Sequence, residues 1–243
     1  MRAVYFAIAA VTLICVGCSK ENASKGSSAK TKVPEAVDLG IIVDGRNVKW
    51  ASFNLGASAP HEYGDYYAWG EIESKANYSW ETYAFSAGAY NRLIKYCPKG
   101  KKDYWDYAKK PEGPDGVSCL YPADDAAHMI LGGKWRMPTN AEWIALRANC
   151  TWTWMKDYNG TGVAGRIGTS TVEGYRNKSI FLPAAGRMDG TAFNDAGSIG
   201  YYWSSDLNTD EPEYAWRGCL NYGAVYGGSS DRFYGQSVRA VAE

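Results

Sequence analysis

Histidine is scarce in this chain: only His61 and His128 occur among 243 residues. Zinc sites in proteins are built from histidine, cysteine and carboxylate ligands, so two histidines argue against a histidine-rich zinc centre. An excess of one charge is also lacking, because 26 Lys and Arg balance 26 Asp and Glu. Without a basic excess we expect no nucleic-acid partner.

Signatures of catalysis and nucleotide binding are lacking as well. No G-x-S-x-G nucleophile elbow occurs in the sequence. Residues 160–165 match G-x-G-x-x-G, but no hydrophobic strand precedes them and no helical pattern follows, as dinucleotide binding requires. We therefore predict a binding protein rather than an enzyme, with no cofactor and no metal.

Long aliphatic runs are scarce except at the N-terminus. Arg2 gives a positive start, and residues 3–16 are apolar but too short to span a bilayer. Gly17 and Cys18 follow, which resembles a bacterial lipoprotein signal. We predict a signal peptide over 1–17 and lipidation of Cys18, and an ordinary cleaved signal is the alternative. Such a chain is expected in the outer membrane, at the cell surface.

The residues after Cys18 are polar and small up to Pro34. Such a composition cannot bury a core, so we predict a flexible tether over 18–34 that reaches roughly 20 Å. A single domain over 35–243 follows. It contains four further cysteines, which permit two disulfides in three pairings or stay as small buried thiols. They are Cys97, Cys119, Cys150 and Cys219.

Aromatic residues and glycine are abundant, with 10 Trp, 19 Tyr and 27 Gly. This composition favours an α+β domain with an aromatic core, short strands and Gly-rich turns. A helix is predicted over 124–131, and the T-x-x-E capping box at Thr139 and Glu142 starts another that runs to Ala148. Loops are predicted over 98–118 and 157–171. Strands are predicted over 48–53, 66–69, 179–184, 201–205, 215–220 and 237–241.

Ordered motifs along the domain resemble one family, the Fibrobacter succinogenes major paralogous domain of bacterial lipoproteins. The motifs are VKWA (48–51), NLGA (54–57), YGDYYAWGE (63–71), DDAAH (124–128), WRMPT (135–139), FLPAAG (181–186), YWSS (202–205) and SVR (237–239). The resemblance implies a C-type-lectin-like fold with short strands, two helices and long loops. It implies neither a reaction nor a defined ligand.

The segment 217–234 is rich in Tyr, Ser, Gly, Asn and Arg, as antibody binding loops are. If Trp216 and Leu220 face the core, strand alternation turns every second residue between them outward. The same corner is the usual ligand face of C-type-lectin-like proteins. We therefore predict that a surface protein or a glycan binds here, through Arg217, Cys219, Asn221, Tyr226, Asp231, Phe233 and Tyr234.

The same segment contains no Lys, Glu, Gln, Met or Trp. These are the five residues that adenine mutagenesis of an Asn codon cannot produce, so the composition is that of a protein diversified by a retroelement. A Gly- and Tyr-rich loop with no such history is the alternative.

Three further alternatives remain open. Residues 135–147 also resemble the R-x-P-T-x-A-E-W segment of formylglycine-generating enzymes, which implies an exported oxidase. A structural subunit of an adhesive surface layer is the second. The third is a calcium-bridged sugar site on an acidic turn, for which a solvated turn is the simpler interpretation. Its carboxylates would be Asp206, Asp210, Glu211 and Glu213.

Overall fold

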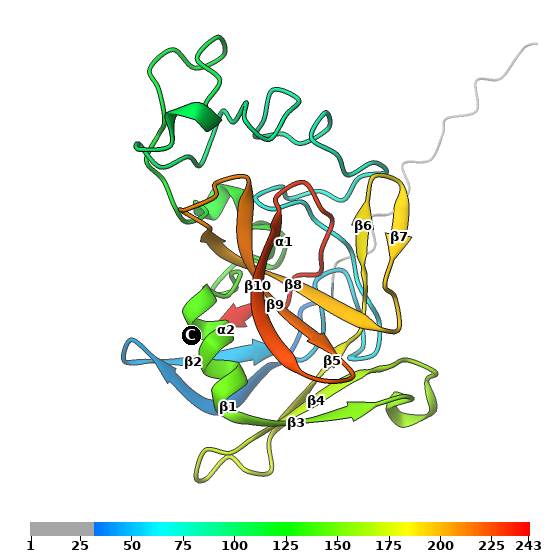
Figure 1. The fold of residues 1–243 in the computed structure, drawn as a ribbon. Coiled ribbons are helices and arrows are strands. Elements are labelled where there is room, and N and C mark those ends of the chain that lie inside the picture. The colour runs from blue at the N-terminus through cyan, green and yellow to red at the C-terminus, as the bar shows by residue number, and fades with distance from the viewer. Residues whose placement is uncertain (1–31) are drawn as a thin grey trace, which may run out of the picture. The chain divides into compact units, whose positions relative to one another are not determined.

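Two α-helices and four small antiparallel sheets make up residues 32–243, the part of the chain that the computed structural model describes (Figure 1). This arrangement confirms the predicted α+β class. The predicted signal peptide, Cys18 and residues 18–31 of the predicted tether lie outside the described residues. Within residues 32–243, no helix combines the length and the apolar character that crossing a bilayer needs.

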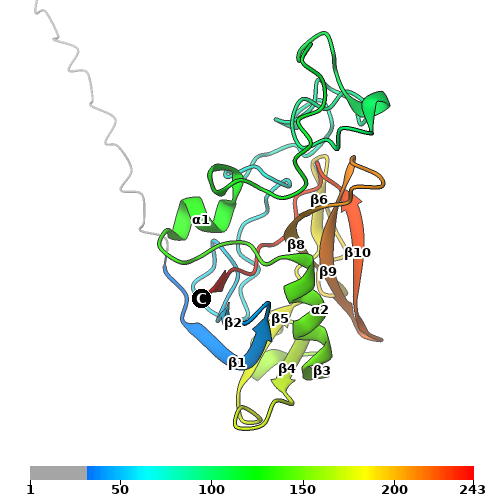
Figure 2. The same cartoon turned by 90° about the vertical axis from the view of Figure 1, so that its left-hand side faces the viewer.

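The central sheet has the strand order β10–β9–β8, and α2 packs against one of its faces (Figure 2). Its strands are β8 (Ile199–Leu207), β9 (Tyr214–Asn221) and β10 (Val225–Asp231). The predicted strands at 201–205 and 215–220 are confirmed. The sequence did not reveal β10, because its Gly-Gly-Ser-Ser centre has low strand propensity.

Helix α2 (Asn140–Ala148) begins as its capping box predicts. The Thr139 hydroxyl accepts a hydrogen bond from the Glu142 N–H at 3.2 Å, and the Glu142 carboxylate accepts one from the Thr139 N–H at 2.8 Å. One turn later, Trp143 is buried and its Nε1 donates to the carbonyl oxygen of Trp203 on β8 at 3.1 Å. This bond and the packing around it fix the helix on the sheet.

The first helix, α1 (Ala126–Leu131), starts two residues later than predicted. The carboxylate of Asp125 caps it by accepting from the His128 N–H at 3.0 Å. Gly132, at φ 68°, ends it as expected, because glycine adopts this backbone conformation without steric cost. His128 therefore belongs to the first helical turn rather than to a metal site.

A second sheet, β1–β2–β11, joins the two ends of the domain. Strand β2 (Arg46–Ala51) lies between β1 (Ala36–Val43) and β11 (Val241–Ala242). The strand predicted at 48–53 is thus confirmed in position. The strand predicted over 237–241 is wrong for most of its length, because residues 235–237 form only isolated bridges with Met188, Tyr67 and Tyr202, and residues 238–240 belong to no strand.

The third sheet, β3–β4–β5, corrects the loop predicted over 157–171. Strand β4 (Gly165–Ser170) is its middle strand, between β3 (Cys150–Met155) and β5 (Ser179–Pro183). Glycine here permits close approach rather than a turn: a Cβ at Gly168 would lie 2.6 Å from the Trp152 ring. The predicted loop is confirmed only for residues 157–164, which include a 3₁₀ turn at Tyr158–Gly160.

Residues 52–124 contain little regular structure. The predicted loop over 98–118 is confirmed, with one 3₁₀ turn at Lys102–Tyr104, and a second turn at Pro122–Asp124 leads to α1. The strand predicted over 66–69 is wrong: Tyr67 forms a single bridge with Gln236. In Figure 1 the teal and green part of this segment lies at the top, and β3–β5 lie at the bottom. The small hairpin of β6 (Arg187–Asp189) and β7 (Ala192–Asn194) completes the sheets.

Among residues 32–243, two arginines are buried completely and form no ion pair with a carboxylate of these residues. Arg232 donates to the carbonyl oxygens of Lys95, Tyr96 and Pro212, each at 3.0 Å, and to the Tyr83 hydroxyl. These bonds tie the irregular segment to the end of β10. Arg239 links segments in the other half of the domain. It donates hydrogen bonds to Asn54 Oδ1 and to the carbonyl oxygens of Ala51 and Phe181.

The four cysteines of the domain are all free thiols. Burial raises the pKa of Cys97 and of Cys150 to about 12, so both are protonated at neutral pH. Cys119 is the exposed one and lies near the Ser205 hydroxyl. The sequence left two alternatives open, disulfides or free thiols, and the structure contains the free thiols.

Candidate functional site

One face of the central sheet is packed against α2, and the opposite face carries the predicted binding residues. Gly218 and Leu220 of β9 point to the α2 side, where a Cβ at Gly218 would lie 2.8 Å from the Trp143 ring. Strand alternation then places Arg217, Cys219 and Asn221 on the other side. The expected division of β9 into an inner and an outer set of side chains is therefore present.

Cross-strand pairing arranges that outer set in rows. Tyr226 of β10, Cys219 of β9 and Tyr201 of β8 are direct neighbours across the sheet. Arg217 occupies the next row, between Gly228 and Trp203. Because Gly228 has no side chain, the guanidinium of Arg217 extends over β10, within 3.7 Å of where a Cβ would stand.

The Tyr201 ring contacts two guanidinium groups. The Arg217 group is 4.8 Å from the centre of the Tyr201 ring, and the Arg187 group of β6 is 4.9 Å from it. Arg187 also stacks on Tyr234 at 4.4 Å. The Tyr201 hydroxyl donates to Asp195 at 2.8 Å, which fixes the ring. The result is a layered cluster of two cations and two aromatic rings.

The two arginines of this cluster have unused hydrogen-bonding capacity. Within residues 32–243, neither Arg187 nor Arg217 forms an ion pair with a carboxylate. Arg217 Nε donates to Ser230 Oγ at 2.5 Å, but its Nη1 and the Nε of Arg187 are shielded and have no partner. The remaining nitrogens, Arg187 Nη1 and Nη2 and Arg217 Nη2, are not among the shielded atoms, so a carboxylate, phosphate or sugar oxygen can accept hydrogen bonds from these charged donors.

Asp231 and its neighbours form the acidic margin of the cluster. Burial, helped by the nearby carboxylates of Glu213 and Asp189, raises the pKa of Asp231 to about 6, against a backbone hydrogen bond and the charge of Arg187, which lower it. Glu213 is buried, and its Oε2 has no hydrogen-bond partner in the described part of the chain. The acidic margin and the arginines give the face charges of both signs side by side.

Not every predicted residue is free to touch a ligand. Cys219 is only 2% exposed, because Tyr201 and Tyr226 flank it, so its predicted role as a direct contact is wrong. Asn221 holds the β9–β10 turn: its Oδ1 accepts from the N–H groups of Gly223 and Ala224 at 2.8 and 2.9 Å.

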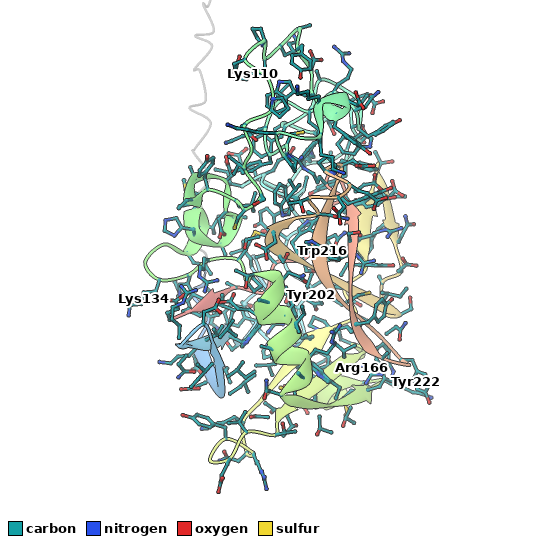
Figure 3. All side chains as sticks on the ribbon, turned by 60° about the vertical axis from the view of Figure 1, so that its left-hand side comes forward. Lys110, Lys134, Arg166, Tyr202, Trp216 and Tyr222 are labelled. Atoms are coloured by element: carbon teal, nitrogen blue, oxygen red, sulfur yellow. The ribbon has the colours of Figure 1, made fainter. Side chains whose placement is uncertain are left out.

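The β9–β10 turn is also held from below. Arg166 on β4 donates to the carbonyl oxygens of Asn221 and Tyr222 (Figure 3). The Tyr222 side chain, 73% exposed, projects from this turn. A fixed turn presents its exposed ring at little entropic cost.

Phe233 and Tyr234 lie at the other end of the face. Their rings are 4.4 Å apart, and Phe233 packs edge-on against Trp80 at 5.3 Å. Phe233 is thus shared between the face and a small cluster beneath it. Tyr234 is joined to Arg217 through Arg187 and Tyr201, so these predicted residues belong to one continuous contact network.

Sequence reasoning missed Arg187 and Tyr201, which are central to the cluster. The sequence predicts only a strand that begins at Tyr201, and the β6–β7 hairpin gives no strand signal because each of its strands has three residues. One signal was available. Arg187 directly follows the FLPAAG motif, in a segment of the sequence that otherwise has few Lys or Arg residues.

The acidic turn near this face does not assemble into a metal site in the described part of the chain. No group of three or more His, Cys, Asp or Glu there is placed to hold an ion. Asp206 instead accepts from the Asn140 N–H at the start of α2, at 2.8 Å. The calcium alternative therefore has no preformed ligand set among residues 32–243.

Two hollows lie in the irregular segment. One of about 600 Å³ is lined by residues such as Phe85, Lys95 and Trp105, and one of about 390 Å³ by residues such as Glu71, Lys75 and Asp124. Lys75 and Lys95 are each paired with a carboxylate there, Glu71 and Asp124 respectively.

Comparison with known proteins adds no neighbour: no family model, no curated protein and no solved structure matches this chain.

Proposed function

We propose that this chain is a lipid-anchored protein of the bacterial cell surface, whose C-type-lectin-like domain binds an external protein or glycan. The ligand contacts the outer face of β8–β10. The observation that carries the proposal is the stack of Arg187, Tyr201 and Arg217, in which two half-buried guanidinium groups have no carboxylate partner among residues 32–243.

Energetic considerations support a binding role for this face. Arginine and tyrosine are the residues most enriched among interface hot spots, and stacking fixes their orientation before a ligand arrives. Arg187, Arg217 and Tyr234 are the proposed principal contacts, and Tyr226 and Asp231 line the margin. Phe233 supports Tyr234 from below. A ligand with anionic or hydroxyl-rich groups next to a flat apolar surface fits this set.

The anchor and the origin of the face are parts of the same proposal. Cys18 carries the lipid, and the polar residues after it hold the domain away from the membrane. Diversification of residues 217–234 by a retroelement would alter β9 and β10 while leaving Arg187 and Tyr201 constant. Sequencing this gene across one population tests that part: variation no greater than in residues 135–147 would remove it.

A ligand screen with matched variants tests the binding face. A glycan array and a pull-down from bacterial and host surface extracts supply the ligand. Binding should weaken by about 2 kcal/mol or more for each of Arg187→Ala, Arg217→Ala and Tyr234→Ala. Arg176→Ala and Tyr107→Ala, exposed residues of the same types in other loops, serve as controls and should bind normally. A ligand that survives all three face variants would refute the assignment.

The anchor has its own test. Cys18→Ser should abolish labelling with a palmitate analogue and release the chain from membranes, because one thiol carries all the acyl chains. Membrane association that is unchanged in this variant would contradict the lipoprotein assignment without touching the binding face.

A further inference from the structure

Strand β10 is an edge strand whose outer backbone groups are unpaired. The Asn221 N–H donates to the Ala224 carbonyl oxygen at one end of the β9–β10 hairpin, and the Arg232 N–H donates to the Glu213 carbonyl oxygen at the other. With the observed register, both bonds require that the even-numbered residues of β10 pair with β9. The N–H and C=O groups of Val225, Gly227 and Ser229 therefore point away from the sheet.

These outward groups have no partner within residues 32–243, where no further strand pairs with β10. In Figure 2 the strand forms the outer margin of its sheet. Natural proteins protect such edges with proline, lysine or bulges. β10 has none of these; its centre is Gly227-Gly228 followed by two serines. The missing side chains leave room for a second backbone to approach.

An arginine stands on each side of this glycine pair. On the α2 side, Arg147 Nη1 is 3.4 Å from the position of a Cβ at Gly227. On the opposite side, the Arg217 guanidinium carbon is 3.7 Å from the position of a Cβ at Gly228. No carboxylate of residues 32–243 pairs with either arginine. The edge is thus flanked by unpaired positive charge on both faces.

We infer that β10 is a docking edge for an extended, acidic polypeptide segment, which adds to the sheet as a fourth strand. Backbone hydrogen bonds to Val225, Gly227 and Ser229 supply the pairing. Neighbouring side chains of a strand point to opposite faces, so two consecutive acidic residues of the partner reach Arg147 and Arg217 respectively. The positive flanks disfavour a second copy of the same edge as the occupant. This site is distinct from the Tyr201 stack and shares only Arg217 with it.

Peptide binding to the full chain in detergent tests the charge pattern. The probe is a fluorescein-labelled, end-capped octapeptide, Thr-Val-Thr-Glu-Glu-Thr-Val-Thr, measured by fluorescence anisotropy. A Lys-Lys version should bind at least about tenfold more weakly, a change of about 1.4 kcal/mol. A version with the two Glu residues separated by one Thr places both on one face and should lose a similar factor. Equal binding of the three peptides would overturn the inference.

Backbone pairing is tested from both sides. Ser229→Pro removes an outward N–H without breaking the β9 ladder and should abolish binding, whereas Ser229→Ala should bind normally. If Ser229→Pro does not fold, N-methylation of alternate amides in the probe replaces it. N-methylation of one alternate set of peptide amides must abolish binding, and N-methylation of the other set must leave it intact. Identical binding of the two methylated peptides would refute strand addition.

Two further measurements separate this inference from the proposed function. Arg147→Gln should weaken the peptide about tenfold, while Tyr234→Ala should not change it. Peptide binding that depends on Tyr234 but not on Arg147 would assign the peptide to the Tyr201 stack and overturn the docking edge. A concentration-dependent dimer in sedimentation that Ser229→Pro dissolves would show a second copy on the edge, with the same consequence.

Discussion

Two pairs of arginines in this molecule sit in opposite situations. Arg232 and Arg239 are fully buried, and every donor nitrogen that is shielded finds an acceptor. Arg187 and Arg217 lie half-buried on the outer face of the sheet, and each retains a shielded donor that has no acceptor among residues 32–243. The first pair has its hydrogen bonds complete in the folded chain. The second pair is oriented by stacking but incomplete, which is the property expected of a binding surface.

The largest effect is expected at Arg239. Arg239→Met leaves Asn54 Oδ1 and the carbonyl oxygens of Ala51 and Phe181 without donors. Each unsatisfied buried group costs about 1–3 kcal/mol, so the free energy of unfolding should fall by about 3 kcal/mol or more. Urea denaturation measures it. A loss below about 1 kcal/mol would show that water or neighbouring groups replace the guanidinium, and that the buried pair is not structural.

Arg217 should give the reverse pattern. Arg217→Ala removes one stacked cation and one bond to Ser230, and should cost less than about 1 kcal/mol of stability because the side chain is half-buried. Ligand affinity should fall by about 2 kcal/mol. Calorimetry of the ligand complex and thermal unfolding of the free protein measure the two quantities. A large loss of stability with unchanged affinity would place Arg217 with the structural pair.

Asp231 makes the acidic margin sensitive to pH. Its folded pKa of about 6 lies above the value of about 3.9 for an unfolded chain, so the folded state binds this proton more tightly. The resulting stabilisation is present below pH 4 and is lost as the pH rises through 6. Asp231→Asn should remove this slope and stabilise the protein at pH 7 by about 1 kcal/mol, a figure reduced because Asp231 is partly exposed. Unfolding curves between pH 4 and 8 measure it, and an unchanged slope would contradict the assignment.

Tyr226 should give the smallest effect. Its ring is 37% exposed and lies on the edge strand. Tyr226→Ala is therefore expected to change the free energy of unfolding by about 0.5 kcal/mol or less. Thermal unfolding of this variant and of Arg239→Met, measured side by side, compares the destabilisation at the face with that at the buried arginine. Comparable destabilisation by both would mean that the face is part of the core.

Local chemistry in the sequence was sufficient for several elements. The Thr139–Glu142 capping box determined the start of α2, Gly132 determined the end of α1, and the apolar alternation around Trp50, Trp203 and Leu220 located β2, β8 and β9. The composition of residues 217–234 also drew attention to the segment that contains Arg217 and Tyr234, two members of one contact network. Each of these signals depends on residues within a few positions of one another, so no tertiary information was needed.

Only the tertiary structure decided which side chains complete the face and which are hidden in it. Arg187 reaches Tyr201 from a hairpin fourteen positions earlier in the chain, and Cys219 is buried because Tyr201 and Tyr226 come from neighbouring strands. Strands β4 and β10 contain glycines, and the sequence of each strand taken alone predicts a loop. The side chains that lie against Gly168 and Gly228, Trp152 and Arg217, come from other strands. Propensity and alternation describe a segment alone, whereas burial and pairing depend on what the fold brings against it.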